Sequence, residues 1–355
     1  MEILLKTGPT AEKLHARLNA WLKSFPEWHD NFVWTPNQTP AWHQPKKPLN
    51  QSTVALISTG GIHLKNQPVF EVSAPFGDSS FRVIPSDSDP RDLMISHTHY
   101  DHAEADHDIN CTFPITHLQS LKQEGVIGHV APRFYGLNGF IPDPRTLVTE
   151  TAPTLTEMLL EDGVDVVLLT PGSAICQQTI GLLQDAFEKA GISTISITLK
   201  PEVTLFMNVP RAVYIRFPYG YSVGPALQPL LQKDIVRKTL ELIDQIQEPG
   251  TVVKLPYRWA GVQAVSQIRS AEPRTQALIN HIDQMLELLK GIETDMAAAQ
   301  QEEHQKPTPD QHKSAFYISQ AQRAAKLAAL LENDAIDQVH GLRNLSGPIF
   351  YLRGK

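Results

Sequence analysis

The sequence predicts an α/β fold on a mainly parallel sheet, and two observations lead to this prediction. Residues 164–199 read as an apolar, β-branched strand, an amphipathic helix and a second strand in immediate succession. A helix that connects two strands in this way makes the strands parallel. Further apolar runs at residues 53–58 and 212–216 supply more strands. We therefore expect a Rossmann-like body, in one lobe or two, with a helical C-terminal region.

The other elements follow from apolar periodicity and from the glycines that end them. Gly60 and Gly61 end the strand at 53–58, Gly125 ends a helix, and Gly191 ends the helix of the strand–helix–strand unit. In chain order we expect a short N-terminal strand and an amphipathic helix, strands at 53–58 and 92–96, helices at 114–124 and 153–162, a strand at 164–170, a helix at 176–189, strands at 192–199 and 212–216, and helices at 230–247, 274–303 and 314–333.

Changes in composition divide the chain into three parts. Residues 1–50 hold four of the five tryptophans among prolines and polar residues, and we expect these rings to fasten an N-terminal arm to the body. Residues 51–225 carry the predicted strands of the α/β body. Residues 226–355 are rich in Gln, Glu and Leu at helical spacing, so we expect a helical region that packs on the sheet or makes a dimer contact.

The bulk composition excludes several classes of protein. The 355 residues are 41% hydrophobic and 19% charged, which is globular and sufficient for one large domain or two ordinary ones. A net charge of −7 argues against a nucleic-acid or anionic-membrane binder, and no run of about eighteen apolar residues is present to span a membrane. With two cysteines, Cys111 and Cys176, the chain is no disulfide scaffold, so we expect a cytoplasmic protein, without a cofactor or resident metal.

A loop with a serine and a cysteine is the first candidate for chemistry. Residues 170–176, Thr-Pro-Gly-Ser-Ala-Ile-Cys, leave the carboxyl end of a predicted parallel strand and open a helix. Ligands bind at this edge of α/β sheets, and a helix N-terminus lowers the pKa of a thiol. Ser173 precedes Cys176 by the spacing of a C-x-x-C redox pair. A cysteine packed as a small apolar residue is an equally good interpretation.

A histidine-rich segment is the second candidate. Residues 97–102 read His-Thr-His-Tyr-Asp-His, which matches the zinc motif of the metallo-β-lactamase superfamily. The later ligands of that fold are missing at the required spacing, because no histidine occurs between His129 and His281. A zinc enzyme remains an alternative hypothesis, with the ligands His97, His99, Asp101 and His102.

Two features suggest binding of a substrate carboxylate. Gly60 and Gly61 end a strand and offer backbone N–H groups. Arg133 offers a planar guanidinium, although a surface arginine is the slightly better interpretation. Acidic residues follow the histidines; we expect Glu104 in a solvated loop, while Asp106 and Asp108 are placed to orient imidazole rings.

Several segments together resemble the glycine/sarcosine/betaine/D-proline reductase selenoprotein B family. The pattern His-x-x-Tyr-Asp falls on residues 97–101, which makes His102 incidental to it. The resemblance runs in order over about residues 52–225. The segments that carry it are 58–62 (Ser-Thr-Gly-Gly-Ile), 96–101 with Asp106, Asn110, Cys111, Phe113 and Pro114, 124–128, 165–181, 211–213 and 218–220.

The resemblance implies an oxidoreductase that reductively cleaves a C–N bond in a small amino acid or betaine. In the family, a selenolate or thiolate of a U-x-x-C loop attacks, and a partner thiol regenerates it. The selenocysteine position falls on Ser173 and the paired cysteine on Cys176. Serine has no two-electron redox couple and is a weak nucleophile without a base. Either a selenocysteine was exchanged for serine during cloning, or the chain is a natural paralogue with changed chemistry.

We therefore expect one site built from the serine–cysteine loop and the histidine-rich segment. Cys176 is the candidate thiolate, His97 or His99 is a proton donor or base, and Asp101 orients a histidine. The residues expected to act in catalysis or binding are Cys176, Ser173, His97, His99, Asp101, Gly60, Gly61, Tyr100 and Arg133. The expected partners are a small amino-acid-like substrate and a thiol carrier or reductase subunit, with self-association as a further option. A non-redox paralogue that binds a small amino acid is the remaining alternative.

Overall fold

The centre of the structure is the strand–helix–strand unit that the sequence predicts. In the computed structural model, which describes residues 2–4, 11–23 and 32–259, β8 (Val166–Thr170), α6 (Cys176–Lys189) and β9 (Ser193–Thr198) follow one another. The two strands pair in parallel. Ile180, Leu183 and Phe187 lie on the buried side of α6, as their helical spacing requires.

One mixed sheet runs through this body, in the order β1-β11-β10-β9-β8-β2-β7-β4, with β6 also pairing with β2. Seven of its strands are parallel, while β1 and β4 pair antiparallel at the two edges. A separate antiparallel pair is formed by β3 and β5. The remaining strands are β1 (Glu2–Leu4), β2 (Thr53–Ser58), β3 (Ile62–Leu64), β4 (Phe81–Pro85), β5 (Leu93–Ile95), β6 (His129–Val130), β7 (Arg133–Leu137), β10 (Arg211–Arg216) and β11 (Thr251–Arg258).

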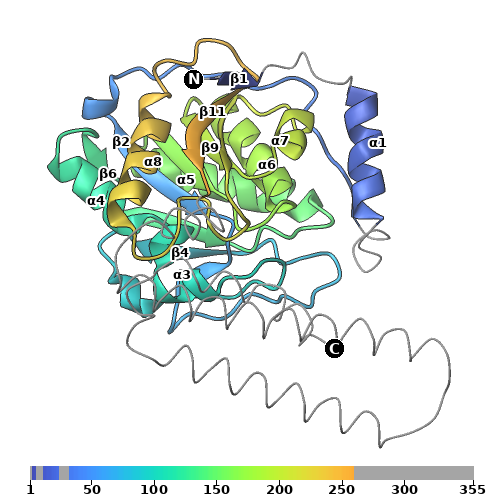
Figure 1. Ribbon diagram of the computed structural model, residues 1–355, viewed down its shortest axis with the longest axis horizontal. Coiled ribbons are helices and arrows are strands. Elements are labelled where there is room, and N and C mark those ends of the chain that lie inside the picture. Colours follow the sequence, from blue (N-terminus) through green and yellow to red (C-terminus); the bar gives the residue numbers. More distant parts are fainter. Residues whose placement is uncertain (1, 5–10, 24–31, 260–355) are drawn as a thin grey trace, which may run out of the picture. The chain divides into compact units, whose positions relative to one another are not determined.

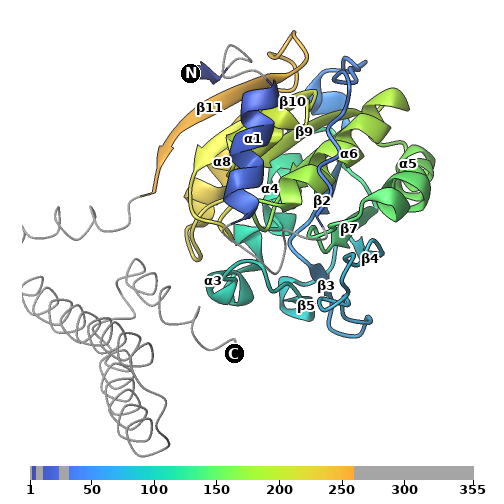
Figure 2. The ribbon, with the colours of Figure 1, turned by 90° about the vertical axis from the view of Figure 1, so that its right-hand side faces the viewer.

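Helices cover both faces of the sheet and enclose two apolar cores (Figures 1 and 2). The helices α4 and α8 contact each other on one face, and α5, α6, α7 and α1 form a contacting series on the other. Their bounds are α1 (Ala11–Leu22), α3 (Ala103–His107), α4 (Ile115–Gln123), α5 (Ala152–Glu161), α6, α7 (Pro201–Phe206) and α8 (Pro229–Glu241). This layered arrangement confirms the α/β class; the Rossmann-like and two-lobed descriptions stay predictions.

Most predicted elements up to residue 216 lie within a few residues of the observed ones, whereas several strands were not predicted. Among these are β4, β7 and β11, and only a helical region was expected after residue 225. The structure has α8 there, but β11 then continues the main sheet beside β10. Lys254 and Pro256 interrupt the apolar pattern of β11, so the pattern of this segment did not predict a strand. The helices expected at 274–303 and 314–333 lie outside the described residues, and the domain boundaries stay predictions.

Trp42 and His43 contact a buried ion pair between β10 and α6. Arg211 at the start of β10 is fully buried, with one guanidinium nitrogen 3.3 Å from Glu188 of α6 and 2.7 Å from the carbonyl oxygen of His43. The indole of Trp42 lies against its guanidinium carbon at 3.9 Å. The predicted packing role of this tryptophan is therefore confirmed.

None of the helices in the described part of the chain is both long enough and apolar enough to cross a membrane.

Candidate functional site

The site lies where the chain changes its direction of progress across the sheet. From β2 the chain proceeds through α4 to β6 and β7 on one side, and then returns to β8 and continues to β9 on the other. The connections after β2 and β8 thus leave these neighbouring strands on opposite faces. Such a switch point, at the carboxyl ends of parallel strands, is where open α/β sheets bind ligands. Thr59 follows β2 here, and the loop to Cys176 follows β8.

The sulfur of Cys176 is surrounded by polar groups from three segments. The Ser173 backbone N–H donates to it at 3.3 Å, and the Ser173 hydroxyl lies 3.1 Å away. From the β2 end, the carbonyl oxygen of Thr59 is placed at 3.5 Å to accept the thiol proton. The Nε2 atom of His97 lies at 3.4 Å. The structure therefore brings the serine–cysteine loop and the histidine-rich segment together.

A backbone hydrogen bond determines which nitrogen of His97 carries the proton. The N–H of His99 donates to Nδ1 of His97 at 3.0 Å, so Nδ1 must be an acceptor. In the neutral ring the proton therefore lies on Nε2, the atom that faces Cys176. Burial, and then the neighbouring His99 and His102, lower the pKa of His97 well below its usual value, which keeps the ring neutral. His97 is thus arranged to donate a hydrogen bond to a sulfur anion rather than to remove the thiol proton.

Burial dominates the titration of the site. It raises the pKa of Cys176, although the hydroxyl and backbone of Ser173 act in the opposite direction. The expectation of a thiol with a lowered pKa is therefore wrong for this closed arrangement, because desolvation outweighs the helix N-terminus. Burial also lowers the pKa of His99 to about 4 and raises the pKa of Tyr100. At neutral pH the site holds a thiol, neutral imidazoles and a neutral phenol.

The remaining residues of the histidine-rich segment hold the loop in place. The hydroxyl of Tyr100 donates to the carbonyl oxygen of Gly60 at 2.7 Å, which links the loop to the end of β2. The carboxylate of Asp101 accepts the backbone N–H of Ala103 at 3.0 Å, at the start of α3. His102 pairs with Asp106 at 2.8 Å, outside the immediate surroundings of the sulfur.

Three expected binding residues are engaged elsewhere. The N–H of Gly60 donates to the hydroxyl of Ser58, and the N–H of Gly61 donates to the carbonyl oxygen of Leu137 at 2.8 Å. Arg133 makes a two-pronged ion pair with Asp162, both N–O distances being 2.8 Å. It starts β7, whereas the site lies beyond the end of that strand, roughly 13 Å away along its four remaining residues.

Glycines that approach the site closely were missed by the sequence analysis. A Cβ atom on Gly172 would lie 2.5 Å from the ring of Tyr100, and one on Gly220 would lie 2.5 Å from the carbonyl oxygen of Asp101. A Cβ atom on Gly139 would lie 2.6 Å from the sulfur of Cys176. The Asn-Gly pair at 138–139 was the available signal, because such pairs mark turns at strand ends.

The prediction for Glu104 is corrected by the structure. Glu104, expected in a solvated loop, is in fact buried.

Replacing Gly139 by alanine is expected to destabilise the protein by about 1–3 kcal/mol, because the new methyl group collides with Cys176 and with the Cβ atom of Thr59 at 2.7 Å. Urea unfolding measures this loss. In a Cys176→Ala background the same substitution should cost less, since the contact with the sulfur is gone and only those with the Cβ atoms of Thr59 and of residue 176, at 2.7 and 2.8 Å, remain. An equal cost in both backgrounds would contradict this assignment of the contact.

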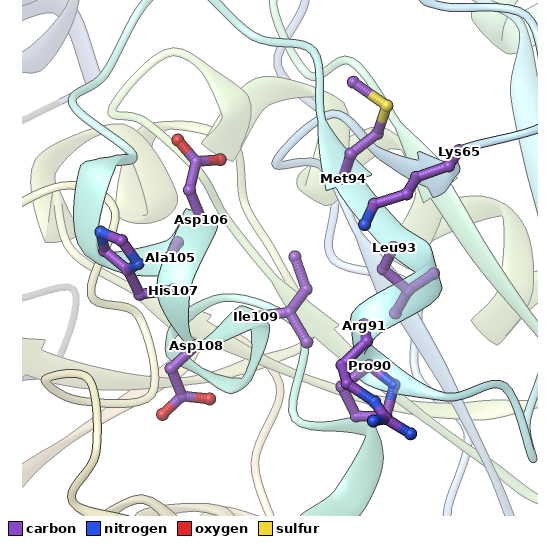
Figure 3. A pocket seen from close by; sticks show the side chains of 10 residues that line it. All are labelled: Lys65, Pro90, Arg91, Leu93, Met94, Ala105, Asp106, His107, Asp108 and Ile109. Carbon is purple, nitrogen blue, oxygen red and sulfur yellow. The ribbon is translucent and has the colours of Figure 1, made fainter.

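A surface pocket of about 370 Å³ lies beside the histidine-rich segment (Figure 3). Part of its lining comes from the two elements that flank the segment: β5 leads into residues 97–102, and α3 leads out of them. In Figure 3, the side chains of Asp106, His107 and Asp108 stand on one side, and those of Leu93, Met94 and Lys65 stand on the other. The pocket thus adjoins the histidine-rich segment, and Cys176 is not among the residues that line it.

A metal site is not supported by the arrangement of the side chains. Over residues 2–4, 11–23 and 32–259, no group of three or more His, Cys, Asp or Glu side chains is placed to hold a metal ion. The rings of His97 and His99 lie at 88° to each other, with Asp101 and His102 engaged as described above. The zinc alternative thus gains no support beyond the sequence motif.

Comparisons with known proteins show which family the chain resembles. The family model of glycine/sarcosine/betaine reductase selenoprotein B matches residues 33–172. The chain is 39% identical over 220 residues to the D-proline reductase subunit gamma of Acetoanaerobium sticklandii, covering 62% of this chain and 90% of that protein. No solved structure matches.

More distant relatives carry related names. The chain is 27% identical over 224 residues to the glycine reductase complex component B subunit gamma of Peptoclostridium acidaminophilum, covering 59% of this chain and 49% of that protein. It is 27% identical over 218 residues to the sarcosine reductase complex component B subunit beta of the same organism, covering 58% and 48%. The chain thus spans about half the length of these two relatives, which are named as components of complexes.

Proposed function

The chain belongs to the glycine/sarcosine/betaine reductase selenoprotein B family, and on this premise we propose that it is the sulfur-bearing subunit of a reductase for a small amino acid or betaine. The single observation that carries the proposal is the contact of 3.4 Å between the sulfur of Cys176 and Nε2 of His97. It joins a potential nucleophile to a proton donor at the switch point of the sheet.

The proposed reaction begins at the sulfur. The thiolate of Cys176 attacks the carbon that bears the substrate nitrogen, so that an S–C bond forms as the C–N bond breaks, and the amine leaves with a proton. A thiolate of a partner protein then attacks the sulfur of this thioether. The electron pair of the S–C bond takes a proton to give the reduced product, and a second partner thiol reduces the resulting disulfide.

Each group around the sulfur has a role in this scheme. Ser173 donates from its backbone N–H and its hydroxyl, and His97 donates from Nε2, so three donors converge on the developing thiolate. Charge-assisted bonds of this kind lower the free energy of a buried anion. Thr59 offers only a carbonyl oxygen, which favours the resting thiol. The arrangement stores the sulfur as a thiol and stabilises it once it is ionised.

The proposal is tested by reduction assays with D-proline, glycine, sarcosine and betaine, with dithiothreitol as the electron donor. We expect turnover of at least one of them, and loss of at least about 10³-fold on Cys176→Ala, because the nucleophile is removed. Cys111→Ala is the matched control, since this second buried thiol is outside the site. Activity that survives in Cys176→Ala would contradict the proposal.

A non-redox paralogue is the second candidate, and Ser173 is the observation that favours it. The same screen separates the two, because a binding protein would be stabilised against heat by one of these compounds without consuming dithiothreitol.

A further inference from the structure

The sulfur of Cys176 is closed off from solvent, although the proposed reaction requires that a substrate reach it. Cys176 is 0% exposed, and His97, which covers it, is 3% exposed. The histidine-rich segment is the cover: the ring of His97 lies against the sulfur, while Thr98 and Asp101 face solvent. Access to the sulfur therefore depends on what holds residues 97–101 in place.

The opposite wall of the site is rigidly built. Gly139 donates its N–H to the carbonyl oxygen of Thr59 at 2.9 Å, and Asn138 forms a β-bridge with Gly60. The N–H of Phe140 donates to the side chain of Asn138 at 3.2 Å. Residues 138–140 are thus pinned to the end of β2 and stand directly beside the sulfur.

One ring pair joins the histidine-rich segment to this wall. The imidazole of His99 stacks on the phenyl ring of Phe140, with 3.7 Å between centroids and 15° between planes. The His99 backbone is the donor that fixes the tautomer of His97. Phe140 therefore acts on the sulfur through two residues: it positions His99, and His99 positions His97.

Residues 97–99 are anchored on both sides, so an opening is confined to them. The N–H of Ser96, directly before them, donates to the carbonyl oxygen of Gly61 at 2.9 Å. The pocket of about 370 Å³ in Figure 3 lies at the surface beside these residues. On the other side, Tyr100 is anchored by its bond to Gly60 and by close contact with Gly172. Residues 97–99 lie between this anchor and β5.

We propose that Phe140 is a positioning residue, whose stack on His99 holds residues 97–99 over Cys176 and controls access to the sulfur. This inference rests on the proposed role of Cys176. Opening the segment breaks the stack, moves His97 from the sulfur and exposes the thiol beside the switch point. Substrate enters while the segment is open, and reclosure returns Nε2 of His97 to the sulfur, where it donates to the developing thiolate in the proposed reaction.

The test is the rate of alkylation of Cys176 by iodoacetamide in the full chain under native conditions, followed by mass spectrometry of the peptides containing Cys176 and Cys111. We expect Phe140→Ala and Phe140→Leu to speed alkylation of Cys176 roughly three- to tenfold, the factor that an aromatic stack contributes to a local equilibrium. Phe140→Tyr, which keeps the stack, should react as the unmodified chain does. Cys111 should be unaffected.

Phe187→Leu is the control for general loss of stability. Phe187 is buried in the core on α6, roughly 16 Å along the helix from Cys176. The inference is overturned if this variant speeds alkylation of Cys176 as much as Phe140→Ala does, because exposure would then occur by global unfolding. It is also overturned if the Phe140 variants react no faster, or if Cys176 of the unmodified chain reacts as fast as a short cysteine peptide. The assay needs no turnover, so failure of the reduction assay leaves its result intact.

Discussion

Replacing Ser173 by cysteine is expected to create a disulfide with Cys176 and to give the site a two-electron couple. The Ser173 hydroxyl already lies 3.1 Å from the sulfur of Cys176, so a small rotation brings two sulfur atoms to bonding distance. The oxidation removes two hydrogen atoms and needs an added disulfide such as oxidised glutathione. We expect a reduction potential in the range of C-x-x-C pairs, roughly −120 to −270 mV.

Equilibration in redox buffers, followed by mass spectrometry of the trapped thiols, measures this potential. Ser173→Ala is the control that changes the same position without adding sulfur, and it should show no couple. If the proposed function holds, Ser173→Cys should also raise the rate of reduction with dithiothreitol, because the second sulfur releases the product without waiting for a partner thiol. If the introduced thiol of Ser173→Cys fails to pair with Cys176, the geometry on which the site is built is contradicted, whatever the substrate.

The largest loss of stability is expected from Arg211→Leu, at about 3–5 kcal/mol in the free energy of unfolding. The substitution leaves Glu188 buried without its cation and removes the hydrogen bond to His43 and the contact with Trp42. Urea unfolding measures the change. Arg237→Leu is the matched control, because this arginine pairs with Glu124 at the surface and should cost less than about 1 kcal/mol. An effect as small as that of the control would contradict a stabilising role for the contacts of Arg211 with Glu188, His43 and Trp42.

The same pair predicts a dependence of stability on pH. Burial raises the pKa of Glu188 to about 7, although Arg211 acts in the opposite direction. A carboxyl whose pKa is raised by folding contributes stability that is present below its unfolded pKa and is lost as pH rises through the folded value. Without Arg211 the pKa rises further, so the loss caused by Arg211→Leu should be larger at pH 8 than at pH 5. The double variant with Glu188→Gln should lose this difference.

Local sequence patterns determined the framework of the fold. The apolar, β-branched runs of β2, β8 and β9 and the periodicity of α6 predicted these elements to within two residues, because each is specified by side chains within one continuous segment. The same reasoning placed Ser173 and Cys176 at the carboxyl end of a parallel strand. The strands β4, β7 and β11 were not predictable in this way, since pairing with distant neighbours rather than their own pattern makes them strands.

The chemistry of the site was decided by tertiary structure. The sequence by itself determined which residues are available: one thiol, one serine and a run of histidines near the ends of two strands. Only the folded chain decided that Nε2 of His97 faces the sulfur, that the ring of Phe140 stacks on His99, and that Arg133 is paired with Asp162 at the other end of β7. It also reversed the expected pKa of Cys176, because desolvation depends on everything packed around an atom, and that packing is assembled from segments up to 117 residues apart.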